Sequence, residues 1–226
     1  GQDNLAYRAA ALLKKAAGVK SGVEITIEKH IPAECGLGGG SSNAATVLKG
    51  LNRLWRLGLS QKELLGLAEK IGSDVSFFVY EVAFALGKGR GERIRPLKGI
   101  KPLWHIVIAP QIKIPTPFAF RRFDRRHTNL LTKTSGDVNI FIRALREHNL
   151  VLTSKCLFND FSRDLLYRHP GLLKTKKALE GLTGREASFS GKGPAIFSLV
   201  NSAKEAGYLK IKLARSHEKV FIVKTF

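Results

Sequence analysis

Residues 36–45 read Gly-Leu-Gly-Gly-Gly-Ser-Ser-Asn-Ala-Ala and have the composition of a phosphate-binding segment. Glycine allows backbone conformations with positive φ and lets a ligand approach the main chain closely. The N–H groups and positive dipole end of a following helix attract anions. Ser41, Ser42 and Asn43 would cap that helix or donate further hydrogen bonds. The segment therefore predicts a phosphate-binding loop, although a plain glycine-rich turn with a serine cap has the same composition.

A carboxylate that could act on a hydroxyl lies further along the chain, at Asp74. It is the only acidic side chain in residues 72–78, Gly-Ser-Asp-Val-Ser-Phe-Phe. Beside a bound nucleotide, such a group can orient a hydroxyl and accept its proton while the oxygen attacks the γ-phosphorus. Gly-Ser-Asp also suits a turn or a helix end, so the residues alone leave a catalytic and a structural role open for Asp74.

The elements that must position these residues follow from the spacing of apolar side chains. Residues 23–29 alternate apolar and charged side chains, which predicts a half-buried strand that ends before Pro32. Apolar residues at helical spacing from Ala44 onward predict a helix after the loop, and Ser60 with Glu63 has the pattern of a capping box. The remaining pattern predicts helices at residues 4–16, 60–70, 137–148, 150–157 and 160–180, strands at residues 82–87, 92–97, 104–109, 186–190, 195–200 and 220–223, and one more helix before the last strand.

Two common nucleotide-binding motifs do not fit the loop. A P-loop ends in Gly-Lys followed by Ser or Thr, and no lysine precedes Ser41. The dinucleotide fingerprint needs a βαβ unit with an acidic residue further on, whereas one helical pattern follows another here. The loop therefore belongs to another class of phosphate site.

Residues 31–45, Ile-Pro-Ala-Glu-Cys followed by the loop, resemble the ATP-binding motif of the GHMP kinase superfamily. The extra glycine pair resembles the form found in 4-diphosphocytidyl-2-C-methyl-D-erythritol kinases. The resemblance extends over essentially the whole chain, because further segments resemble signatures of those kinases in the same order: Asp3-Asn4-Leu5, residues 72–78, Gly89-Arg90-Gly91-Glu92, Ile114-Pro115-Thr116-Pro117, Asn159-Asp160-Phe161 and residues 190–194.

The resemblance implies an α+β fold with two lobes. Residues 1–112 would form the GHMP kinase N-terminal ATP-binding domain, a ribosomal-protein-S5-like lobe that here lacks its opening strands. Residues 113–226 would form a ferredoxin-like C-terminal domain. The family's lysine near the reacting phosphate and its cytosine-binding Gly-Tyr-His segment have no match in this sequence. Because the chain begins at Gly1 and contains no methionine, we expect that an upstream segment precedes it.

The resemblance also implies ATP-dependent phosphorylation of a hydroxyl of 4-diphosphocytidyl-2-C-methyl-D-erythritol in non-mevalonate isoprenoid (terpenoid) biosynthesis, with ATP and Mg²⁺. Asp74 would then be the catalytic base. Ser42 is a candidate Mg²⁺ contact as well as a candidate cap, and Lys192, which stands where the family usually has serine, would touch a phosphate or face solvent. The expected ATP-binding residues are Asn4, Pro32, Gly36, Leu37, Gly38, Gly39, Gly40, Ser41, Ser42 and Asn43, and the expected substrate-binding residues are Thr116, Gly191, Lys192 and Gly193.

The net charge of +20 is larger than a small-molecule kinase needs. Such a field attracts a nucleotide and a nucleic acid alike, so a second hypothesis is a kinase-like protein that serves as a nucleic-acid- or ribosome-associated binding module. The basic residues are dispersed, apart from a cluster at Arg121, Arg122, Arg125 and Arg126, and no RNA-recognition signature accompanies them. A small-molecule substrate is therefore favoured over a nucleic acid.

Composition also bounds the setting of the protein. No apolar run reaches the roughly 20 residues of a membrane-spanning helix, so we expect no membrane partner. Cys35 and Cys156 form neither a disulfide framework nor a metal-binding pattern, and we expect Cys35 to be a packing residue. The chain would act in the cytoplasm, or in a plastid or another organelle, as a monomer or homodimer.

Overall fold

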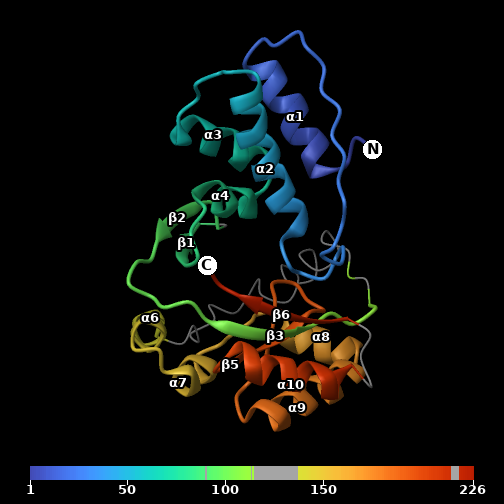
Figure 1. Ribbon diagram of the computed structural model, residues 1–226, viewed down its shortest axis with the longest axis vertical. Coiled ribbons are helices and arrows are strands. Elements are labelled where there is room, and N and C mark those ends of the chain that lie inside the picture. The colour runs from blue at the N-terminus through green and yellow to red at the C-terminus, as the bar shows by residue number, and fades with distance from the viewer. Residues whose placement is uncertain (90, 113, 115–136, 215–218) are drawn as a thin grey trace, which may run out of the picture. The chain divides into compact units, whose positions relative to one another are not determined.

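Contacts within the chain divide it into two compact units (Figure 1). The computed structural model describes residues 1–89, 91–112, 114, 137–214 and 219–226. The first unit comprises residues 1–31 and 38–98, and the second comprises residues 32–37 and 99–226. This division by contacts falls before residue 99, whereas the domain boundary expected at residues 112 and 113 adjoins residues outside the described ranges and stays a prediction.

The described part of the first unit consists of helices packed on one another and a β-hairpin. α2 packs against α1 and α4, and α4 also packs against α3. Ala9, Ala44 and Ala68 are fully buried between these helices, and their small side chains let the helices approach closely. The elements are α1 (Leu5–Ala16), α2 (Gly39–Leu54), α3 (Gln61–Ile71), α4 (Ser73–Tyr80), β1 (Ala85–Lys88) and its antiparallel partner β2 (Arg93–Pro96).

Two helices of this unit begin where the sequence predicts. The side-chain oxygen of Asn4 accepts the N–H of Ala6 at 3.0 Å and caps α1. The Ser60 hydroxyl accepts the N–H of Glu63 at 3.3 Å, while the Glu63 carboxylate accepts the N–H of Ser60 at 2.8 Å. The capping box at the start of α3 is therefore confirmed.

A four-stranded antiparallel sheet forms the centre of the second unit, with its strands in the order β4-β5-β3-β6. Along the chain, helices separate β3 from β4, β5 follows β4 directly, and α10 precedes β6, which is the βαββαβ order of a ferredoxin-like fold. The predicted ferredoxin-like lobe is confirmed. The elements are β3 (Trp104–Ile108), α6 (Val138–Arg146), α7 (Leu150–Lys155), α8 (Ser162–Arg168), α9 (Gly171–Thr183), β4 (Ser188–Phe189), β5 (Ile196–Val200), α10 (Ala203–Leu213) and β6 (Val220–Lys224).

The two faces of this sheet carry separate apolar clusters. Ile106 and Ile196 lie in the cluster that α9 and α10 cover (Figure 1). Val107, one residue along β3, lies in the other cluster, because successive side chains of a strand point to opposite faces. Cys35 joins this second cluster, and burial raises the pKa of its thiol, so its predicted packing role is confirmed. The segment 32–37 that opens the glycine loop is therefore anchored on the sheet.

Two sequence predictions about secondary structure were wrong. Residues 23–29 form no strand, because a strand requires a hydrogen-bonded neighbour and no described segment pairs with them. The helix predicted at residues 160–180 is divided into α8 and α9. The division falls at His169, which precedes Pro170 and has a non-helical backbone (φ −127°, ψ 73°), since a proline disfavours helical backbone in the residue before it.

Some predictions concern residues outside the described ranges. These are the substrate-binding Thr116 and the basic cluster at residues 121–126. Helices formed by the described residues lack the combination of length and apolar character that crossing a membrane requires.

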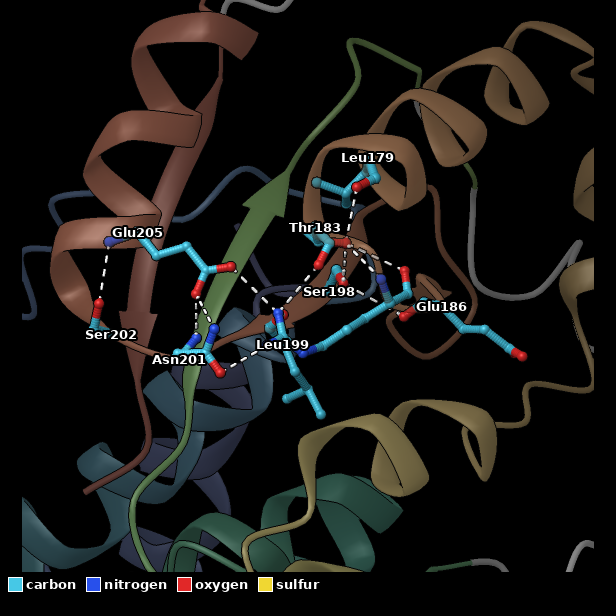
Figure 2. Close-up of polar contacts among 9 residues, drawn as sticks. Leu179, Thr183, Glu186, Ser198, Leu199, Asn201, Ser202 and Glu205 are labelled. Atoms are coloured by element: carbon cyan, nitrogen blue, oxygen red, sulfur yellow. Dashed lines mark hydrogen bonds and ion pairs between the residues drawn. The ribbon is translucent and has the colours of Figure 1, made fainter.

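Partly buried acidic side chains of α9 and α10 form ion pairs and hydrogen bonds with other residues of the second unit. Figure 2 shows Glu205 among Asn201, Ser202 and Leu199. The guanidinium of Arg185, whose side chain is 11% exposed, donates to Glu205 at 3.3 Å, to Asn201 at 2.7 Å and to the Thr183 carbonyl at 3.2 Å. In α9, the Glu180 carboxylate pairs with Lys176 and accepts the N–H of Ala187 at 3.1 Å. These bonds hold the helix ends to the sheet.

We expect Arg185→Met to lower the free energy of unfolding by about 2 kcal/mol, because it leaves half-buried acceptors without a donor. Urea denaturation measures this. Arg143→Met is the matched control, since Arg143 pairs with Glu147 on an exposed helix surface at 3.6 Å and such pairs contribute little. Equal losses in the two variants would contradict a structural role for the Arg185 network.

Candidate active site

The N-terminus of α2 offers hydrogen-bond donors that the described protein does not use. The helix begins at Gly39, and its cap is Gly38, whose φ of 68° is left-handed and which has no side chain to accept a hydrogen bond. The first backbone bond runs from the Ser42 N–H to the Gly38 carbonyl at 2.9 Å. The N–H groups of Gly39, Gly40 and Ser41 donate to no other described residue. Together with the positive dipole end, they suit an anion.

The predicted capping by the polar residues of the loop is wrong. Ser41, Ser42 and Asn43 lie inside α2, and no side chain caps that helix. The cap position falls instead on Gly38, because a glycine can adopt the left-handed backbone there. The hydroxyl and amide groups of these three residues are therefore not occupied by capping.

Asp74 lies on the face of α4 that meets this helix start. Phe78 follows Asp74 by four residues, so the two side chains share one face of α4. A Cβ atom on Gly38 would lie 2.9 Å from the Phe78 ring, which shows how closely that ring packs on the cap of α2. Asp74 occupies the first turn of α4, is exposed, and makes no ion pair with another described residue. Its carboxylate is available to a ligand.

The second unit brings two glycine segments into backbone contact. Gly36 has a φ of 76°, and a Cβ atom there would lie 2.1 Å from the Ser190 carbonyl oxygen. The Ser190 hydroxyl donates to the Gly36 carbonyl at 2.9 Å, and the Ala195 N–H donates to the Cys35 carbonyl at 3.1 Å. The glycine turn at residues 190–193 thus packs directly on the opening of the loop.

The Lys192 residue of this turn is half-buried. Its ammonium donates to the backbone carbonyl of Ile114, so it does not simply face solvent. Its expected contact with a phosphate stays a prediction. Desolvation by burial lowers the pKa of Lys192, and the charges of Glu34 and Cys35 partly offset this. A phosphate in place of the Ile114 carbonyl would give the Lys192 ammonium a negatively charged partner.

Comparisons with known proteins agree with this geometry. A family model described as "GHMP kinases N terminal domain" matches residues 4–82. The 4-diphosphocytidyl-2-C-methyl-D-erythritol kinase of Ligilactobacillus salivarius is 34% identical over 99% of this chain and 75% of its own length, and that of Symbiobacterium thermophilum is 37% identical over 99% and 78%. This chain belongs to the GHMP kinase family.

Solved structures place this GHMP kinase in the same fold. A crystal structure of 4-(cytidine 5'-diphospho)-2C-methyl-D-erythritol kinase matches with a TM-score of 0.82 and 32% identity, over 99% of this chain and 78% of that one. The homoserine kinase from Cytophaga hutchinsonii matches with a TM-score of 0.77 at 19% identity, over 100% and 76%, which shows the fold alone. The α+β fold expected from the sequence is confirmed.

Other candidate residues of the kinase have structural roles. Asn4 caps α1, and the following Leu5 lies near Gly40, because a Cβ atom there would be 3.5 Å from a Leu5 methyl group. Pro32 and Leu37 are half-buried in the second unit. The contacts of Phe78 with Gly38 were not predictable from the motifs, since they depend on how α2 and α4 pack.

We expect Gly36→Ala to disrupt the loop, because the added Cβ atom would collide with a backbone oxygen. Gly99→Ala is the matched control: Gly99 has the same φ of 76° but open space around it, so it reports the backbone strain alone, about 1 kcal/mol. Gly36→Ala should lower the free energy of unfolding by roughly 2 kcal/mol more. Equal losses in urea denaturation would contradict the close approach of the two segments.

We expect Lys192 to make stability depend on pH. Its pKa in the folded chain lies below that in the unfolded chain, so between the two values the unfolded chain binds more protons and stability rises with pH. The free energy of unfolding of the wild type should therefore increase relative to Lys192→Met as the pH rises toward the ordinary lysine pKa of about 10.4. A flat or falling difference in urea denaturation would rule out this burial of the charge.

Proposed function

We propose that this chain is an ATP-dependent kinase that phosphorylates a hydroxyl of 4-diphosphocytidyl-2-C-methyl-D-erythritol. The observation that carries the proposal is the N-terminus of α2, where three N–H groups donate to no described residue and lie beside the face of α4 that bears Asp74. The relatives named above, over nearly the whole chain, support the choice of acceptor. They are all kinases and do not favour the alternative of a nucleic-acid-binding module.

Phosphoryl transfer depends mainly on position and on stabilisation of charge. In the proposed site, the N–H groups of Gly39, Gly40 and Ser41 hold phosphate oxygens of ATP. Asp74 orients the acceptor hydroxyl and accepts its proton as the oxygen attacks the γ-phosphorus. Neither role requires a side chain to leave an existing partner among the described residues.

When bound together with the nucleotide, Mg²⁺ would reduce the negative charge of the phosphates. We propose the Ser42 hydroxyl as the ligand from this chain. The described residues contain no group of three His, Cys, Asp or Glu side chains placed to hold a metal. The fit rests on chemistry: Mg²⁺ in kinase sites takes hard oxygen ligands, many of them from phosphates and water, and the Ser42 hydroxyl is such a donor.

We assign each remaining candidate residue to one of the two reactants. Asn4 and Pro32 would contact the nucleotide, together with Leu37 and Asn43 of the loop. Gly191, Lys192 and Gly193 would contact the phosphates of the acceptor through the turn, and Thr116 would present its hydroxyl to the acceptor. Asn4 can do so while it caps α1, because that cap uses only its side-chain oxygen.

We expect Asp74→Asn to lower kcat at least 100-fold, because the amide cannot accept the proton, and to leave ATP binding intact. A coupled assay of ADP release with the cytidylyl acceptor measures kcat, and calorimetry measures ATP binding.

The matched control is Asp137→Asn in α6. Asp137 is also an aspartate at a helix start, where it accepts the Asn139 N–H at 2.9 Å, and asparagine caps equally well. This variant should keep wild-type turnover. Wild-type turnover in Asp74→Asn would refute the catalytic assignment, and no turnover in the wild type would refute the acceptor.

A further inference from the structure

Asn159 holds the glycine turn at residues 190–193 from outside the turn. Its amide nitrogen donates to the carbonyl of Phe189 at 2.9 Å and to that of Gly191 at 2.7 Å. Its side-chain oxygen accepts the N–H of Phe161 at 2.9 Å. The orientation of the amide is therefore fixed, because a reversed amide would set its oxygen against two carbonyl oxygens.

These bonds decide which backbone groups of the turn remain for a ligand. Asn159 occupies the carbonyls of Phe189 and Gly191, and the Ser190 carbonyl accepts the Gly193 N–H at 2.8 Å. The N–H groups of Gly191 and Lys192 donate to no described residue. Gly191 is also exposed. Successive free N–H groups in a turn can bind an anion.

The segment that follows Asn159 also packs against Gly193, at the other end of the turn. α8 begins three residues after Asn159, and its Leu165 side chain packs so closely on Gly193 that a Cβ atom there would lie 2.8 Å from a leucine methyl group. Gly193 has a φ of 72°. The turn is thus held at one side by hydrogen bonds and at the other by van der Waals contact.

We propose that Asn159 is a positioning residue that shapes the turn at residues 190–193 for binding a phosphate. By binding the carbonyl oxygens of Phe189 and Gly191, it keeps them from an incoming phosphate and leaves the N–H groups of Gly191 and Lys192 to receive it. This inference rests on the proposed kinase function. Asn159 itself touches no reacting atom and acts through the turn.

Three substitutions of Asn159 test the proposal. Asn159→Ala removes both donors, and Asn159→Asp keeps the acceptor for Phe161 but sets a carboxylate against two carbonyl oxygens. We expect kcat/KM to fall about 10- to 100-fold in the first, as a small misplacement of a binding group can do, and further in the second. Asn159→Gln keeps both donors one methylene away and should recover part of the loss.

A structural role alone would give a different pattern. Asn149→Ala is the matched control, because Asn149 likewise accepts a backbone N–H, that of Leu152 at 3.0 Å, at the start of α7. It should lower the thermal unfolding midpoint and leave kcat/KM unchanged. If Asn159→Ala also lowers only the unfolding midpoint, the positioning role is overturned.

Binding of inorganic pyrophosphate separates this inference from the proposed function, since it needs no acceptor and no turnover. We expect Asn159→Ala to weaken pyrophosphate binding to the whole chain at least about 10-fold, because two hydrogen bonds that shape the turn are lost. Weakened binding with no turnover in the wild type would refute the acceptor and retain the role of Asn159. Turnover in the wild type with unchanged pyrophosphate affinity in Asn159→Ala would overturn it.

Discussion

The carbonyl oxygen of Ser190 occupies the space that a side chain at residue 36 would need, and the glycine loop depends on this close approach. Two hydrogen bonds then join the segments, from the Ser190 hydroxyl to Gly36 and from Ala195 to Cys35. Because Cys35 is buried on the sheet, the opening of the loop takes its position from the most regular part of the second unit. Backbone contact at Gly36, supported by the Ser190 hydroxyl and the buried Cys35 side chain, sets this geometry.

The loop's other end is fixed by different means in the first unit. Gly38 ends the loop with a left-handed backbone, and the ring of Phe78 lies against it. The absence of a side chain at Gly38 thus serves the helix start and the packing of α4 together. Asp74 in the first turn of α4 stabilises the helix dipole. Because its carboxylate is exposed, this structural role is compatible with the catalytic role that we propose.

The sequence predicted those features that depend on local chemistry. Gly36 and Gly38 of the predicted loop do adopt positive φ, and Ser60 with Glu63 does form a capping box. The prediction of a strand at residues 23–29 was wrong. Alternation of apolar and charged residues indicates the two faces of a strand, but it does not show that another segment pairs with that strand. The cap of α2 was misplaced, since a glycine cap leaves no side-chain signal. The hydrogen bonds of Asn159 span about 30 residues of sequence, and no spacing rule reveals them.

The ion pairs of the glutamates on α9 and α10 affect how fast anions encounter these helices. Glu180 and Glu205 are held by Lys176 and Arg185, and the exposed charged residues of these helices are all lysines: Lys174, Lys177, Lys204, Lys210 and Lys212. Their field speeds the diffusional encounter with anions, and at physiological salt it decays within about 8 Å. The rate of encounter between an anion and this surface therefore falls as ionic strength rises.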